Sequence, residues 1–81
     1  MNGPHETIYS RVPLERMLTD RRGRASFRFR FGTMRDLARH CGVQIEEKDG
    51  YNAFSAPKMK LQMFAEKLHF ARVKYTEGEP K

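Results

Sequence analysis

Arginine is the residue type that offers most chemistry in this chain, and its distribution is uneven. Nine arginines fall between residues 11 and 39, a stretch that contains only three acidic residues. Nine positive and three negative charges give this stretch +6, which equals the formal net charge of the whole 81-residue protein. A planar guanidinium binds phosphate or carboxylate at two points and is less strongly hydrated than ammonium. The spacing therefore predicts a surface that binds anions.

Two segments alternate basic and apolar residues in the manner of half-buried strands. Residues 26–31 read SFRFRF and residues 70–75 read FARVKY. If both strands turn one apolar side toward a core, their basic residues share the opposite, open face. Like charges on neighbouring strands repel, so this gathering is favoured where an anion meets it. The cations expected on that face are Arg28, Arg30, Arg72 and Lys74.

Five further arginines and one tyrosine complete the predicted binding surface. Two arginines stand one turn apart on the polar side of a predicted helix, and three lie in a loop before the first alternating strand. The tyrosine would face outward from an interior strand, where unpaired bases can stack on its ring. Contacts made by arginine to phosphates are mostly independent of base sequence and weaken steeply with salt. These additional residues are Arg35, Arg39, Arg21, Arg22, Arg24 and Tyr51.

The clearest local signal is the dipeptide Asp49-Gly50, which lies between two extended runs and supplies the backbone angles of a tight hairpin turn. We expect strands at about 43–48 and 51–56. Their register makes one face of the ribbon apolar and the other polar, and a slip of one residue would destroy this division. The expected pairs are Lys48 with Tyr51, Glu46 with Ala53, Gln44 with Ser55, Ile45 with Phe54, and Val43 with Ala56.

Apolar residues at helical spacing predict two helices. The first begins after Thr33, with Asp36 positioned to complete a capping box, and ends at Gly42. The second runs from about 57 to 69. A strand within residues 7–12 and a short helix that opens at Pro13 are expected at the N-terminal end.

From residue 25 onward the predicted order is β-α-β-β-α-β. This split β-α-β arrangement is a small α+β fold, an antiparallel sheet with two helices on one face. For residues 70–75 a continuing helix competes with the last strand. A chain of this length buries one small core, so we expect a single domain over residues 6–75 with disordered ends at 1–5 and 76–81.

Composition excludes some classes of protein. No apolar run approaches the roughly 20 residues of a membrane span, so no membrane partner is expected. The lone Cys41 cannot form an intramolecular disulfide, which indicates a cytoplasmic protein. His40 and Cys41 diverge by about 100° on a helix and do not face each other. No histidine, cysteine and acid set has zinc-site spacing, so neither a metal nor another cofactor is expected.

These features predict a small, basic, non-enzymatic and regulatory domain that binds DNA or RNA mainly through phosphates. The alternative is an accessory or inhibitor protein whose basic face docks on an acidic surface of a larger, nucleic-acid-handling protein. A small ribonuclease-type toxin stays open as an enzymatic alternative, and so does a homodimer. A helix-turn-helix and a ribbon-helix-helix dimer rank lower, because the Asp49-Gly50 turn lies where a further helix would have to pass.

Overall fold

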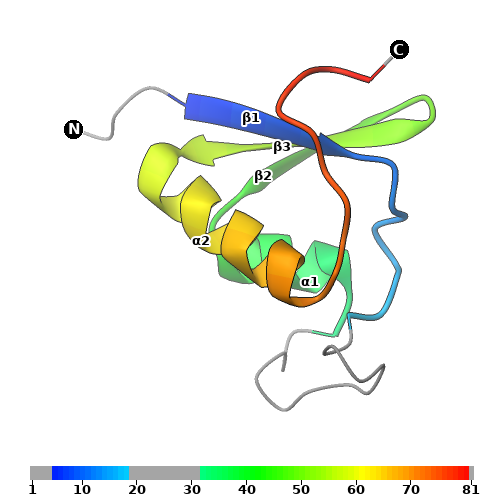
Figure 1. Ribbon diagram of the computed structural model, residues 1–81, viewed down its shortest axis with the longest axis horizontal. Coiled ribbons are helices and arrows are strands. Elements are labelled where there is room, and N and C mark those ends of the chain that lie inside the picture. The colour runs from blue at the N-terminus through cyan, green and yellow to red at the C-terminus, as the bar shows by residue number, and fades with distance from the viewer. Residues whose placement is uncertain (1–4, 19–31, 81) are drawn as a thin grey trace.

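The computed structural model describes residues 5–18 and 32–80. Over these ranges the chain forms an antiparallel sheet with strand order β1-β3-β2, so β3 is the central strand. Both helices lie on the same side of this sheet (Figure 1), which leaves two layers. The elements in chain order are β1 (His5–Ser10), α1 (Met34–His40), β2 (Gln44–Lys48), β3 (Tyr51–Pro57) and α2 (Lys58–Phe70).

The predicted α+β class and antiparallel sheet are confirmed, but the predicted order is wrong. The described elements follow the order β-α-β-β-α, and the first strand is His5–Ser10, close to the strand expected within residues 7–12. The alternating segment 26–31 lies outside the described residues. Residues 70–75 do not form a strand, because α2 continues to Phe70.

The hairpin of β2 and β3 has the predicted register, from Gln44 opposite Ser55 to Lys48 opposite Tyr51. Gly50 has a φ of 87°, the positive angle that the tight turn requires. The expected pair of Val43 with Ala56 is wrong. The Val43 amide instead donates to the carbonyl of Ala38 at 2.8 Å and so ends α1.

One row of side chains across the sheet forms the centre of the core. Ile8 of β1 and Ile45 of β2 both stand opposite Phe54 of the central strand. The Phe54 ring is fully buried and contacts Phe64 of α2, with ring centroids 5.1 Å apart. Removing such an aromatic side chain from a core typically costs about 3–5 kcal/mol. This row therefore attaches the helical layer to one face of the sheet.

The two helices end in the same way, although their sequences differ. After α1, Gly42 adopts a φ of 74° and Val43 donates back to Ala38. After α2, Arg72 adopts a φ of 61° and Val73 donates to the carbonyl of Leu68 at 2.8 Å. This hydrogen-bond pattern is a Schellman motif, in which the residue with positive φ is usually glycine. Val73 then enters the core, so the chain turns away from α2 instead of adding a strand.

The N-terminal part of the domain contains a turn where a helix was expected. The Arg16 amide donates to the carbonyl of Pro13 at 3.1 Å, and no helix forms over the described residues 13–18. Leu14 and Leu18 are nevertheless buried in the core. The helix prediction is therefore wrong for this stretch because the burial of its two leucines is achieved by a turn.

Candidate functional site

The predicted site residues do not converge on one surface. Arg72 and Lys74 follow α2 and do not lie on the open face of the sheet, so their predicted placement is wrong. Both are exposed. Tyr51 lies on the central strand and is half-buried. The remaining predicted arginines of residues 19–31 lie outside the described residues: Arg21, Arg22, Arg24, Arg28 and Arg30.

The two arginines of α1 differ in their surroundings. Arg35 binds Glu15 through a 2.9 Å ion pair that joins α1 to the turn after Pro13. Arg39 is exposed in the last turn, where a positive charge is favoured by the helix dipole. Arg35 therefore links α1 to the turn that contains Glu15. The position of Arg39 is typical of a basic residue at the C-terminal end of a helix.

A groove at the end of β1 gathers three cations that are distant in sequence. Its volume is about 560 Å³. Arg11, Arg16 and Lys74 line it together with the rings of Tyr9 and Tyr75, and of the described residues that line it none is acidic. We call this feature the basic groove. The full set of lining residues is Tyr9, Ser10, Arg11, Val12, Pro13, Arg16, Lys74, Tyr75, Thr76 and Pro80.

The basic groove is built by backbone contacts between β1 and the segment after α2. Tyr9 and Thr76 exchange two backbone hydrogen bonds of 2.8 Å. The buried Ser10 hydroxyl donates to the carbonyl of Lys74 at 2.8 Å and accepts the amide of Val12 at 3.1 Å. Buried polar groups are kept in place by such bonds. The positions of Lys74 and of the chain leaving β1 are therefore fixed relative to each other.

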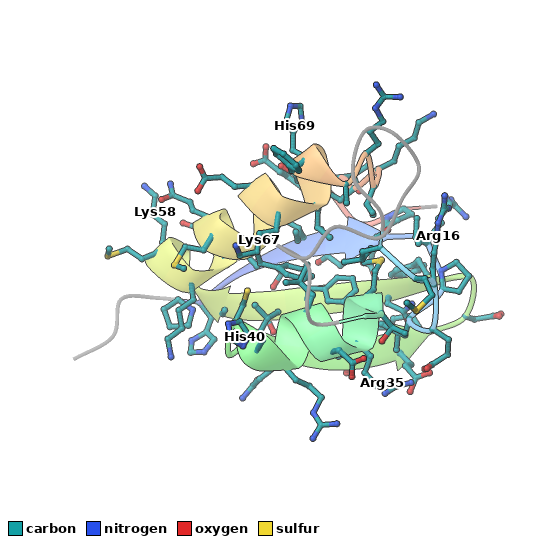
Figure 2. The ribbon with its side chains drawn as sticks, turned by 90° about the horizontal axis from the view of Figure 1, so that it is seen from below. Arg16, Arg35, His40, Lys58, Lys67 and His69 are labelled. Carbon is teal, nitrogen blue, oxygen red and sulfur yellow. The ribbon has the colours of Figure 1, made fainter. Side chains whose placement is uncertain are left out.

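Two cations of the basic groove belong to the arginine-rich stretch but were not among the predicted site residues. Arg11 and Arg16 are close in sequence, separated by Pro13, and nothing in their spacing predicts a shared surface. Their convergence with Lys74 depends on the pairing of residues 9 and 76, which no local pattern encodes. Arg16 lies at one end of the molecule and Lys58 at the other (Figure 2). Neither Arg16 nor Lys74 forms an ion pair with a residue that the structure describes.

The described residues on either side of the arginine-rich segment 19–31 lie near Arg16 of the basic groove. The Leu18 amide donates to the carbonyl of Gly32 at 2.9 Å, and Met17 pairs with Thr33. The Met34 amide donates to the carbonyl of Arg16 at 3.1 Å. Leu18 and Gly32, the described residues that flank the segment, are therefore held close to Arg16, which lines the groove.

The sheet face opposite the helices carries a pair of tyrosines. The rings of Tyr9 and Tyr51 meet edge to face, with centroids 5.9 Å apart. The Tyr51 hydroxyl donates to the carboxylate of Glu79. This hydrogen bond, with smaller contributions from desolvation and nearby negative charge, raises the pKa of Tyr51 to about 12. Tyr9 also lines the basic groove, so the tyrosine pair and the cations adjoin.

Other reactive side chains in the described part of the chain do not assemble into a site. No group of three or more histidine, cysteine or acidic residues there has the geometry to hold a metal ion. Burial raises the pKa of the Cys41 thiol, which opposes formation of the nucleophilic thiolate. Cys41 packs against the core. No helix of the described chain is long and apolar enough to cross a membrane.

We found no family model, curated protein or solved structure that matches this chain. The geometry and charge of the basic groove are therefore the features from which a function can be inferred.

Proposed function

We propose that this protein is a non-enzymatic domain that binds nucleic acid mainly through its phosphates, at the basic groove. The observation that carries the proposal is the meeting of Arg11, Arg16 and Lys74 in one groove whose described lining includes no acid. Basic and acidic residues nearly balance over the described chain, so composition alone does not account for this local excess. A regulatory role and a cytoplasmic location remain predictions.

The groove has the chemistry that phosphate recognition needs. Arginine forks bind phosphate oxygens in pairs, and lysine binds them as a point charge. A volume of about 560 Å³ lies within the range of small-ligand sites, so one or two nucleotides fit and a duplex would meet the groove only through its backbone. The rings of Tyr9 and Tyr75 add apolar surface beside the charges.

The segment 19–31 carries further cationic charge in the sequence. It contains five arginines against the single acid Asp20, and the described residues that flank it, Leu18 and Gly32, are hydrogen-bonded to each other near Arg16. In our proposal its guanidinium groups supply further phosphate contacts along the same nucleic acid. Cations gathered in this way raise the association rate as well as the affinity.

The backbone conformation of Arg72 gives independent support to the proposed function. It is left-handed, and this conformation is unfavourable for a residue with a side chain. Its φ of 61° suits glycine, as the equivalent Gly42 after α1 shows. A left-handed conformation costs a non-glycine residue roughly 1–2 kcal/mol. A charged residue kept at such a position, two residues before Lys74, is consistent with a functional demand for positive charge.

Fluorescence anisotropy titration of a labelled oligonucleotide at several salt concentrations tests the proposal. Arg16→Gln and Lys74→Gln should each weaken binding for every base sequence and lower the slope of log K against log salt by about one. Lys58→Gln removes the same charge from the far end of the molecule and should change the slope little. Absence of binding by the unmodified protein at low salt would refute the proposal, and so would equal losses for Lys58→Gln and Lys74→Gln.

A second function is favoured by the outer face of α2. Met59, Met63 and Phe70 lie on the side of α2 opposite the core, with exposures of 79%, 55% and 38%. The helix begins without a side-chain cap and without an acidic residue in its first turn, where Lys58 and Lys60 oppose the helix dipole. Lys58, Lys67 and His69 project from this helix in Figure 2. Glu66 lies beside Met63 and Phe70 on this face, so its fit to an acidic surface of a partner protein depends on the neighbouring lysines, Lys58 and Lys67.

Affinity purification of the protein after nuclease treatment tests this second function. A stoichiometric protein partner that is lost on Met63→Asp, and kept on Lys74→Gln, would support an accessory or inhibitor role at α2. Retention of the same partner by Met63→Asp would refute docking at this face. Circular dichroism of Met63→Asp checks folding, which we expect to be preserved because Met63 is exposed.

A further inference from the structure

The sheet face opposite the helices continues the surface of the basic groove. Alternation along the strands places Tyr9 on this face from β1 and Tyr51 from β3, next to the small Ala53. The two rings are in contact, and Tyr9 is shared with the groove. The cations of the basic groove and the half-buried rings of the tyrosine pair therefore adjoin through Tyr9.

We propose that the ligand of this surface is a single strand of nucleic acid, whose unpaired bases stack on Tyr9 and Tyr51 while its phosphates lie in the basic groove. This inference rests on the proposed function and narrows the class of ligand. Bases in a duplex stack on one another and are inaccessible to aromatic side chains. The bases of a single strand can stack on such side chains. A duplex would be bound by the cations of the basic groove, but the tyrosine rings would not add to its affinity.

The C-terminal segment holds an acid at the same place. Thr76 pairs with Tyr9, and Glu79 accepts the hydrogen bond of the Tyr51 hydroxyl. The Glu79 carboxylate lies at the Tyr51 hydroxyl, and its negative charge would repel the phosphates of a strand whose base stacks on that ring. A strand that stacks on Tyr51 must therefore displace Glu79, so this contact acts against binding.

Variants of Tyr51 and Glu79 distinguish what the Tyr51 ring, the Tyr51 hydroxyl and the Glu79 carboxylate each contribute to the affinity for nucleic acid. Anisotropy titrations use labelled oligo(dT) and a mixed-sequence duplex of the same length. Tyr51→Ala should weaken oligo(dT) binding by about tenfold, in the range measured for one stacked base, and change duplex binding less than twofold. Tyr51→Phe keeps the ring and loses only the bond to Glu79, so oligo(dT) binding should be equal or tighter. Glu79→Gln should tighten it severalfold.

The control is Phe70→Ala, which removes a part-exposed ring from the helical layer and should leave both affinities unchanged. Tyrosine fluorescence of the unmodified protein provides a measurement that needs no substitution at the hairpin. It should be quenched when oligo(dT) binds, and less so in Tyr51→Phe, which lacks one of the reporting phenols. Binding of oligo(dT) without quenching would overturn the inference.

Equal oligo(dT) affinity for the unmodified protein and for folded Tyr51→Ala would also overturn it. If Lys74→Gln still weakens binding in that case, the proposed function stands and only the stacking of single strands is refuted. If the unmodified protein binds neither oligonucleotide at low salt, the proposed function itself fails.

Discussion

Replacing Arg72 by glycine should make the protein more stable and a weaker binder of nucleic acid. The φ of 61° at this position costs an L-residue roughly 1–2 kcal/mol, and glycine adopts it freely. Glycine also adds about 0.4–1 kcal/mol of conformational freedom to the unfolded chain, which offsets part of the gain. We therefore expect Arg72→Gly to raise the free energy of unfolding by about 0.5–1 kcal/mol, or about 3–6 °C in Tm for a domain of this size.

Urea or thermal unfolding followed by circular dichroism measures the stability change, and anisotropy titration measures the binding change. Arg72→Ala is the matched control, because it removes the same charge and leaves a side chain in the left-handed conformation. Both variants should bind an oligonucleotide more weakly and to the same extent, while only the glycine variant gains stability. The reasoning about backbone strain is refuted if Arg72→Gly is no more stable than Arg72→Ala.

Three further predictions concern the groove, a helix start and a titrating group. Ser10→Ala leaves the carbonyl of Lys74 without its donor and should cost about 1–3 kcal/mol in urea unfolding while weakening oligonucleotide binding; unchanged stability would contradict this. Thr33→Ala removes the N-cap of α1 and should cost about 0.5–2 kcal/mol of stability with the charges of the groove left in place. The raised pKa of Tyr51 means that its bond to Glu79 contributes stability below about pH 10, and that this is lost as pH rises toward about 12. Tyrosinate absorbance should therefore show a late-titrating phenol whose pKa falls in Glu79→Gln, and an unaltered titration would contradict the assignment.

Local chemistry explains which parts of the fold follow from the sequence. The register of the hairpin follows from Asp49-Gly50 and from the alternation that places Ile45 opposite Phe54, all within about ten residues. The start of α1 follows from Thr33 and Asp36, which form the capping box observed in the structure. These features need no information about distant parts of the chain, so the sequence predicts them correctly.

The end of α2 shows how a local pattern misleads. The alternation over residues 70–75 is typical of a strand, and no glycine marks the end of the helix. Yet Ala71-Arg72-Val73 repeats the arrangement of Cys41-Gly42-Val43, with arginine in the place of glycine. The burial of Val73 beside Leu68 stabilises this ending, and that gain depends on tertiary packing.

The position of the basic groove could not be predicted from the sequence. An excess of arginine predicts anion binding without any knowledge of the fold, because charge is a sum over residues, and this stays a prediction. The groove itself depends on contacts between Ser10 and Lys74, which are 64 positions apart. Only the folded chain brings Arg11 and Arg16 to Lys74. The alternation of basic and apolar residues along the expected strands therefore predicted a site with other arginines.

A titration of the protein with short oligo(dT) at low salt, followed by the backbone amide signals in NMR spectra, tests the central claim most directly. The amides of residues 9–12, 14–16 and 74–76 should shift together and saturate together, while those of the first turn of α2 stay in place. Shifts centred on α2, or spectra that do not change, would contradict binding of nucleic acid in the basic groove.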